Sequence, residues 1–140
     1  MFSFLLDVEQ DHPMVAEYYA AWSKTLIAEA NDFSQGRVNF HPAIYGSRGD
    51  NKTWSELTKA MDSGAVCDGV WIARYFNSQI PRPWNDSVVN PTVPLNCPIL
   101  AWQYWASPDN APEDLNFDVN LASPAHFDML VERLVMSPVG

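Results

Sequence analysis

Apolar and polar positions along the 140-residue chain follow two periods, one typical of strands and one typical of helices. Helical spacing predicts a first helix from Pro13 to about Asn31 with Asp11 as its N-cap, a second over 51–63 that ends at Gly64, and a last one from Ser123. Two segments, 77–96 and 106–114, have no sustained period and predict loops without helices. Short apolar runs predict strands at 2–9, 37–47, 68–76, 97–105 and 115–121.

This order of elements predicts an α/β fold. Strands that alternate with helices favour a parallel sheet covered by helices on both faces. Pro42 lies inside the second predicted strand, and because proline removes one ladder donor, it indicates an edge strand or a bulge. The chain has neither an internal repeat nor a linker-like segment, so we expect residues 1–140 to form a single domain.

The charge of the chain restricts its partners. Asp and Glu number 17 against 8 Lys and Arg, which gives a formal net charge of -9. Such a surface repels phosphate backbones and anionic lipids, so we expect neither nucleic acid nor a membrane as a partner. The first residues lack the basic region of a secretory signal, so we expect that any export signal lies outside this chain or does not exist. The sequence leaves the compartment open.

The cysteines and histidines do not predict a metal site. Cys67 and Cys97 each precede an apolar run, and if these runs are neighbouring parallel strands the two thiols could bridge; two buried free thiols are the alternative. Neither cysteine has a second ligand at the spacing of a metal site, and His12, His41 and His126 are scattered. We therefore expect no metal and no cofactor.

Acids and amides occupy alternate positions in the first and last predicted strands. Asp7 and Glu9 share one strand face, and Asn116, Asp118 and Asn120 share another. Near the carboxyl ends of parallel strands, where α/β folds bind ligands, these side chains would enter a common region. A solvated strand end is the alternative for the first pair.

Aromatic residues occupy the strands between these acids. Trp71 and Tyr75 share one face of the third predicted strand, and Trp102 and Tyr104 share one face of the fourth. Aromatic surfaces beside carboxylates suit sugar rings, which stack on the aromatic faces while their hydroxyls bind polar groups. Packing in the core is the alternative for each of these residues.

Five segments, "FLLDVE", "AIYGS", "VWIARY", "AWQYW" and "FDVN", occur in an order that resembles the later part of the family 25 glycoside hydrolases, the muramidase-type lysozymes, and of the related glycoside hydrolase-like barrel domains. The resemblance covers nearly the whole chain. It implies a partial (β/α) TIM-like barrel, made of about the last five strands of an irregular eight-stranded barrel whose first strands are missing. Residues 1–140 would then be an N-terminally incomplete barrel, able to self-associate through its open sheet edges.

The resemblance also implies roles for particular residues. Glu9 would be the general acid, Asp7 the partner carboxylate that attacks or that orients the substrate's N-acetyl group, and Asp118 a third acid in the same pocket. The residues expected to contact sugar are Tyr45, Trp71, Tyr75, Gln103, Tyr104 and Asn120.

Three functions are therefore compared. The first is a lysozyme-type glycoside hydrolase domain that cleaves, or formerly cleaved, a peptidoglycan-type polysaccharide. The second is a carbohydrate-binding barrel without activity. The third is a flavodoxin-like domain with a ligand at the switch point of a parallel sheet, although the chain has no GxGxxG or Walker pattern.

Overall fold

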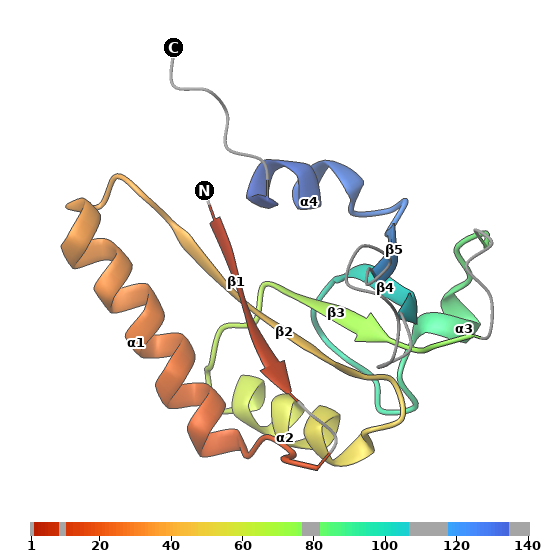
Figure 1. The fold of residues 1–140 in the computed structure, drawn as a ribbon. Helices are drawn as coiled ribbons and strands as arrows, with labels where there is room; N and C mark the ends of the chain where they lie inside the picture. Colours follow the sequence, from red (N-terminus) through yellow and green to blue (C-terminus); the bar gives the residue numbers. More distant parts are fainter. Residues whose placement is uncertain (1, 9–10, 77–81, 107–117, 135–140) are drawn as a thin grey trace, which may run out of the picture.

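The computed structural model describes residues 2–8, 11–76, 82–106 and 118–134. The described part contains a five-stranded sheet and four helices, which confirms the predicted α/β class (Figure 1). In chain order the elements are β1 (Phe2–Val8), α1 (Ala16–Ser34), β2 (Phe40–Ser47), α2 (Asn51–Asp62), β3 (Gly69–Ala73), α3 (Asp86–Val89), β4 (Ile99–Ala106), β5 (Asp118–Ala122) and α4 (Phe127–Leu134).

The strands follow one another across the sheet in the order β1-β2-β3-β4-β5. The first four are parallel, but β5 is antiparallel to β4, so the prediction of an all-parallel sheet is wrong for this strand. Ala106 at the end of β4 pairs with Asp118 at the start of β5, so the chain returns from the same end of the sheet instead of crossing over. The strand order never reverses, and the sheet therefore lacks the switch point that a flavodoxin-like domain requires.

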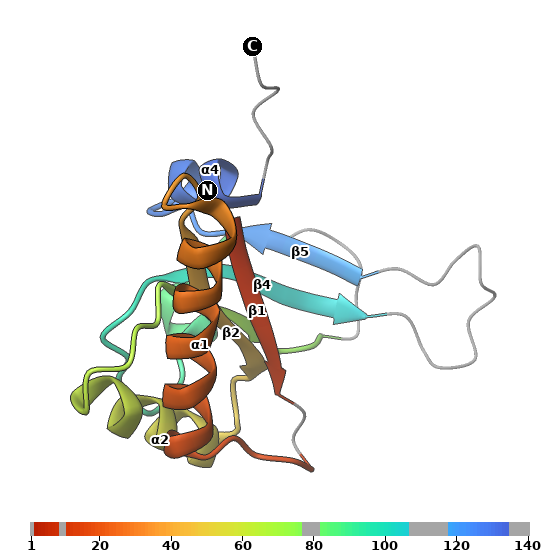
Figure 2. The same cartoon turned by 90° about the vertical axis from the view of Figure 1, so that its left-hand side faces the viewer.

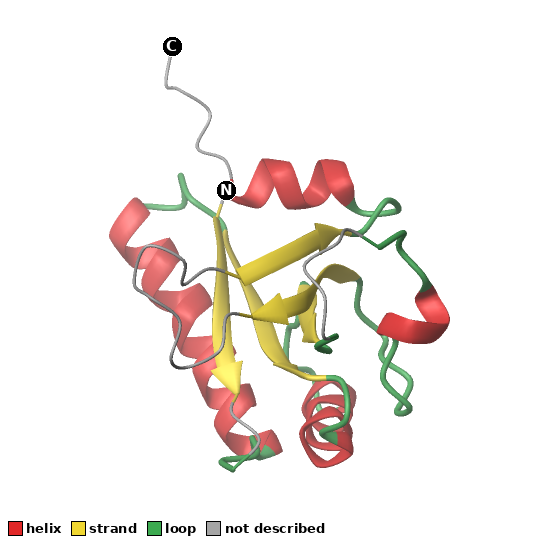
Figure 3. Cartoon of the chain, turned by 45° about the vertical axis from the view of Figure 1, so that its right-hand side comes forward, coloured by secondary structure: helices red, strands yellow, loops and turns green. Residues whose placement is uncertain are grey.

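Helices α1 and α2 lie on the same side of the sheet, as Figure 2 shows. Ile44, Val70 and Ile72 from the strands pack there with Trp54 and other helix residues, and all four are fully buried. Right-handed crossovers between strands that are neighbours in sequence and in space place their helices on one side, and Figure 3 shows α1 and α2 beside the strands. These two crossover helices therefore do not cover both faces as predicted. Helix α4 also packs against the sheet, where it contacts β1 and β4.

Pro42 does not mark an edge, because β2 lies between β1 and β3. The Pro42 carbonyl accepts a hydrogen bond of 2.8 Å from the amide of Asp68, so this residue faces the β3 side. Regular pairing with β3 begins only at Ala43 and Gly69. The missing N–H of proline therefore falls just before the ladder starts, where it removes no strand pairing.

The ends of the helices depend partly on distant residues. Val15, not Asp11, is the N-cap of α1, and it makes no side-chain cap. Instead the amide of Ala16 donates to Glu56 Oε2 of α2 over 3.0 Å, so a neighbouring helix supplies the acceptor. Gly64 follows α2 with a positive φ of 94°, as its predicted C-terminal position requires.

The predicted loop at 77–96 contains a short helix. Residues 86–89 form α3, and the side chain of its N-cap Asn85 accepts from the amide of Ser87 over 3.0 Å. Residues 77–81 of this predicted loop, and most of the loop predicted at 106–114, lie outside the described residues.

Gly69 begins β3 where Leu100 of β4 lies against the backbone. A Cβ atom on residue 69 would lie 2.6 Å from Leu100 Cγ and closer still to its Cδ1. Because Leu100 is 2% exposed, it has little room to move. We expect Gly69→Ala to lower the free energy of unfolding by about 1–3 kcal/mol in urea denaturation. Gly49→Ala is the matched control, since its nearest atom is Ser47 Oγ at 4.0 Å, and a change within about 0.5 kcal/mol is expected.

Candidate functional site

A hollow of about 520 Å³ lies on the face of the sheet opposite α1 and α2, and every strand contributes to it. The lining residues are Leu5 and Asp7 of β1, Tyr45 of β2, Trp71 of β3, Tyr75 two residues after the end of β3, Gln103 and Ala106 of β4, and Asp118 and Asn120 of β5. All of these except Leu5 and Ala106 are residues that the sequence predicted for the site. The structure therefore gathers most of the predicted residues around one space.

The strand register explains why these side chains meet. Asp7 pairs with Tyr45, and Tyr45 pairs with Trp71, so a row of side chains crosses three strands on one face. Gln103 pairs with Asn120 and extends the row to β5. Asp118 lies at the same end as the carboxyl ends of β1 to β4 because β5 runs in the opposite direction.

Three polar side chains form a hydrogen-bonded group in the hollow. The Tyr45 hydroxyl donates to Gln103 Oε1, and the Tyr75 hydroxyl donates to the same oxygen over 3.2 Å. The two hydroxyl oxygens lie 2.9 Å apart. Gln103 is only 6% exposed, so its buried amide holds both phenol rings in place. The Tyr75 side chain remains 55% exposed.

Trp71 is held by a second hydrogen bond that spans the sheet. Its indole Nε1 donates to Asn120 Oδ1 over 3.0 Å, which joins β3 to β5 across β4. Strands two apart in a flat sheet are separated by about 9–10 Å, so this bond fits a sheet that curves around the hollow. The indole thus has a fixed orientation at the surface of the hollow.

The two carboxylates come from opposite edges of the sheet, Asp7 from β1 and Asp118 from β5. Within the described part of the chain, neither has an ion-pair partner. Burial raises the pKa of the Tyr45 phenol above its ordinary value, and the hydrogen bond with Tyr75 and the charges of Tyr75, Asp7 and Asp118 raise it further. The negative charges of both carboxylates therefore act on the Tyr45 hydroxyl.

The raised pKa of Tyr45 predicts its behaviour in alkaline titration. An unfolded tyrosine ionises near about pH 10, whereas the pKa of Tyr45 in the folded state is higher. This difference in pKa stabilises the folded state below about pH 10, and the stabilisation is lost as the pH rises through the folded-state pKa. We expect Tyr45→Phe to leave unchanged the absorbance step of the tyrosines that ionise near about pH 10 in the folded protein. A smaller step in the variant would show that Tyr45 titrates normally.

Tyr104 does not reach the hollow, contrary to the prediction that it contacts sugar. It is 1% exposed and packs in the core, with its ring centre 5.6 Å from that of Trp102. Gln103 faces the hollow, and side chains alternate along a strand, so Tyr104 lies on the helix-covered face. Glu9 and Asn116, also predicted for the site, lie outside the described residues.

Two arginines near the hollow were missed by the sequence analysis. Arg48 and Arg74 line a second space at the carboxyl ends of β2 and β3, which shares Tyr45 and Tyr75 with the first. Each directly follows the last residue of its strand. This position after a strand was the signal that could have identified them.

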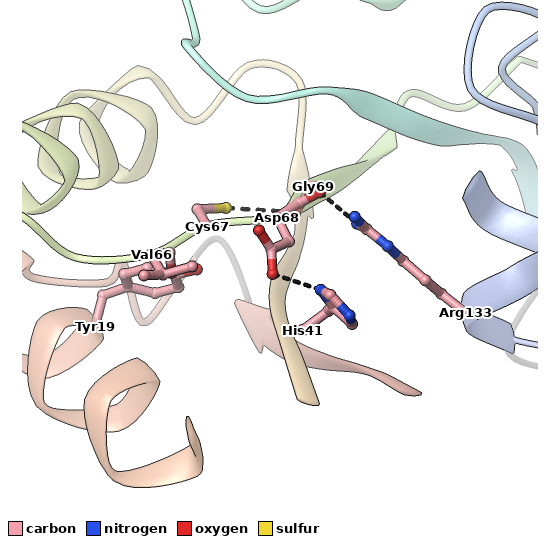
Figure 4. Close-up of polar contacts among 7 residues, drawn as sticks. All are labelled: Tyr19, His41, Val66, Cys67, Asp68, Gly69 and Arg133. Carbon is pink, nitrogen blue, oxygen red and sulfur yellow. Dashed lines mark hydrogen bonds and ion pairs between the residues drawn. The ribbon is translucent and has the colours of Figure 1, made fainter. Parts of the chain in front are cut away.

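The opposite end of the strands has a different polar cluster, centred on Asp68 (Figure 4). Its carboxylate lies 2.7 Å from His41 Nδ1, and its carbonyl accepts from Arg133 of α4 over 2.8 Å. Cys67 beside it donates to the Gly69 carbonyl over 3.4 Å, and both Cys67 and Cys97 are free thiols. The Arg133 contact joins α4 to the residue that precedes β3, at the end of the strands away from the hollow.

Neither a metal site nor a membrane span was found in the described ranges. No group of three or more His, Cys, Asp and Glu side chains there could hold a metal ion. No helix among these residues has the length and apolar character to cross a membrane.

Comparison with known proteins gives the fold but no family. No family model matches the chain, and no curated protein matches it. It is similar to a solved structure described as a "1.07 A crystal structure of an uncharacterized B. stearothermophilus protein", with 18% identity and a TM-score of 0.62. The similarity covers 91% of this chain but 55% of that protein, so this chain spans about half of its length. It supports the α/β architecture alone.

Proposed function

We propose that this chain is a lysozyme-type glycoside hydrolase domain that holds a peptidoglycan-type polysaccharide in the hollow. The observation that carries this proposal is the meeting of two carboxylates, three aromatic rings and two amides from five strands around one space. Stacking surfaces beside hydrogen-bonding groups suit a sugar ring, whose faces are apolar and whose edge carries hydroxyls. The size of the hollow, about 520 Å³, falls within the usual range for ligand sites of about 300–1,000 Å³.

In this proposal the chemistry is performed by carboxyl groups at the end of β1. Glu9 follows Asp7 by two residues in the sequence and would be the general acid that protonates the glycosidic oxygen. Asp7 would attack the sugar or orient the substrate's N-acetyl group, and Asp118 would lie across the bound ring. The role of Glu9 rests on the sequence pattern.

The proposal extends to the architecture: the five strands would be the last part of an irregular eight-stranded (β/α) barrel. Three findings support this. The strands lie in chain order, the helices of the βαβ units lie on the outer face, and the side chains of all five strands converge on one hollow. Strands β1 and β5 would then be free edges, through which copies of the chain can associate.

A carbohydrate-binding domain without hydrolysis is the second candidate. The observation that favours it is that the binding surface is held together without Glu9. Tyr45 and Tyr75 are fixed by Gln103, and Trp71 is fixed by Asn120, so a sugar can be bound by these residues alone.

Incubation of the purified chain with insoluble peptidoglycan tests both candidates. Release of new reducing ends together with co-sedimentation of the chain would support the hydrolase. Co-sedimentation without release would support the binding domain. A folded chain that neither sediments with the polymer nor releases reducing ends would contradict the proposal.

A further inference from the structure

Two free thiols lie at the amino ends of neighbouring strands, away from the hollow. Cys67 precedes the first residue of β3 by two positions, and Cys97 precedes the first residue of β4 by two. These strands are parallel neighbours, and at their start the amide of Val70 donates to the carbonyl of Pro98 over 2.9 Å. Paired strands lie about 4.7–4.9 Å apart, which falls within the Cα separation of disulfide-bonded cysteines, about 4.4–6.8 Å.

The side chains of the two cysteines contact each other in the core. Cys67 belongs to the buried apolar cluster, and Cys97 packs against that cluster. A hydrogen bond from the Cys97 thiol, helped by one from the Tyr19 hydroxyl, lowers the pKa of Cys67 despite its burial. The bond to Cys67 and burial together raise the pKa of Cys97. Cys67 is therefore the sulfur that carries the negative charge when the pair loses one proton.

The surroundings of the pair select small reagents. Cys67 is 8% exposed, and Cys97 is half-buried. Tyr19 of α1, which is fully buried, lies beside Cys67 and donates its hydroxyl to the Val66 carbonyl over 3.1 Å (Figure 4). This limited exposure admits hydrogen peroxide, which is little larger than water, more readily than a bulky reagent such as oxidised glutathione.

We propose that Cys67 and Cys97 are a site of reversible oxidation, at which hydrogen peroxide converts the two thiols to a disulfide that joins the start of β3 to the start of β4. This inference does not depend on the proposed function. In the first step the Cys67 thiolate attacks one peroxide oxygen, the O–O bond breaks, and the hydroxide that leaves takes up the proton the pair had lost. The sulfur of Cys97 then attacks the sulfenic acid sulfur of Cys67, and a second water leaves with the Cys97 proton. The two thiols thus lose two electrons and two protons, and the peroxide is reduced to two waters.

The disulfide closes a segment that carries part of the hollow. Residues 68–96 lie between the two cysteines and include Trp71 and Tyr75, which line the hollow. Closing this segment lowers the entropy of the unfolded chain, so we expect the oxidised protein to be more stable than the reduced one.

Treatment of the reduced full chain with hydrogen peroxide tests this inference. Peptide mapping by mass spectrometry should recover Cys67 and Cys97 in one cross-linked pair of peptides, and the melting temperature should rise by about 5–15 °C. Dithiothreitol should reverse both changes, whereas sulfoxides at the five methionines should persist because their repair needs a reductase enzyme. Unchanged thiols, sulfinic acid at Cys67 beside a free Cys97, or disulfides formed only between chains would each overturn the proposal.

Two serine variants separate the roles of the sulfurs. In Cys97→Ser no second thiol can attack the sulfenic acid, so dimedone should label Cys67 and peroxide should not raise the melting temperature. In Cys67→Ser the label on Cys97 should be weak, since burial still raises the pKa of its thiol.

Melting of each reduced variant before treatment is the folding check, and the cross-link in the native chain can be measured even where a variant does not fold. A rise in melting temperature that persists in Cys97→Ser would overturn the disulfide as its cause. Equal labelling of the two variants would overturn Cys67 as the attacking sulfur.

Discussion

Replacing Glu9 with Gln is expected to lower the rate of reducing-end release from peptidoglycan by about 10²–10⁴-fold. Glutamine has nearly the same shape as glutamate but cannot donate a proton to the glycosidic oxygen. In the proposed function the sugar contacts come from Trp71, Tyr75 and Gln103, which line the hollow, so co-sedimentation with the polymer should stay close to that of the native chain. The measurement is a paired assay of both quantities on the same preparations.

A matched control for this change is Asp11→Asn, because Asp11 is an exposed acid just beyond Glu9 in the chain. It should leave the rate of release unchanged. Equal rates for the native chain and for Glu9→Gln would show that another group donates the proton. Loss of co-sedimentation in Glu9→Gln would make Glu9 a binding residue.

Replacing Tyr75 with Ala is expected to weaken sugar binding by about thirtyfold, which corresponds to about 2 kcal/mol. Tyr75 presents an exposed ring to the hollow, and its hydroxyl is held by Gln103 and Tyr45. Its removal takes away a stacking surface and frees the neighbouring phenol of Tyr45. The measurement is a titration with a soluble peptidoglycan tetrasaccharide.

Tyr18→Ala provides a control of the same kind. Tyr18 of α1 is 56% exposed and Tyr75 is 55% exposed, so both changes remove a similar exposed ring. Only the Tyr75 change should affect affinity, while Tyr75→Phe should lose less because the stacking face remains. Equal losses at both positions would mean that binding does not depend on the hollow.

Much of the hollow was predictable because strand periodicity is a local property. Asp7, Trp71, Tyr75, Asp118 and Asn120 were placed on common faces by their alternation alone, and the strand register then brought those faces together. The resemblance to the glycoside hydrolases added Tyr45 and Gln103. This part of the site needed no knowledge of distant contacts.

Other features depend on long-range packing and could not be predicted from the sequence. The burial of Tyr104 follows from the face that Gln103 occupies, in a part of β4 where the register shifts. The cap of α1 comes from Glu56, forty residues away along the chain. Which side of the sheet the helices cover follows from the order of the strands, which periodicity does not give. Arg48 directly follows β2, which the sequence could have indicated, but only the structure shows that its buried Nε has no partner among the described residues.

The most direct test of the sugar site follows the indole N–H signals of the six tryptophans during titration with the peptidoglycan tetrasaccharide. Trp71→Phe assigns the signal of Trp71, whose indole already donates to Asn120. We expect the Trp71 signal to shift with saturating dependence on ligand, while that of Trp54, which is fully buried beneath the other face, stays in place. A Trp71 signal that does not move at any ligand concentration would contradict the assignment of the hollow as a sugar-binding site.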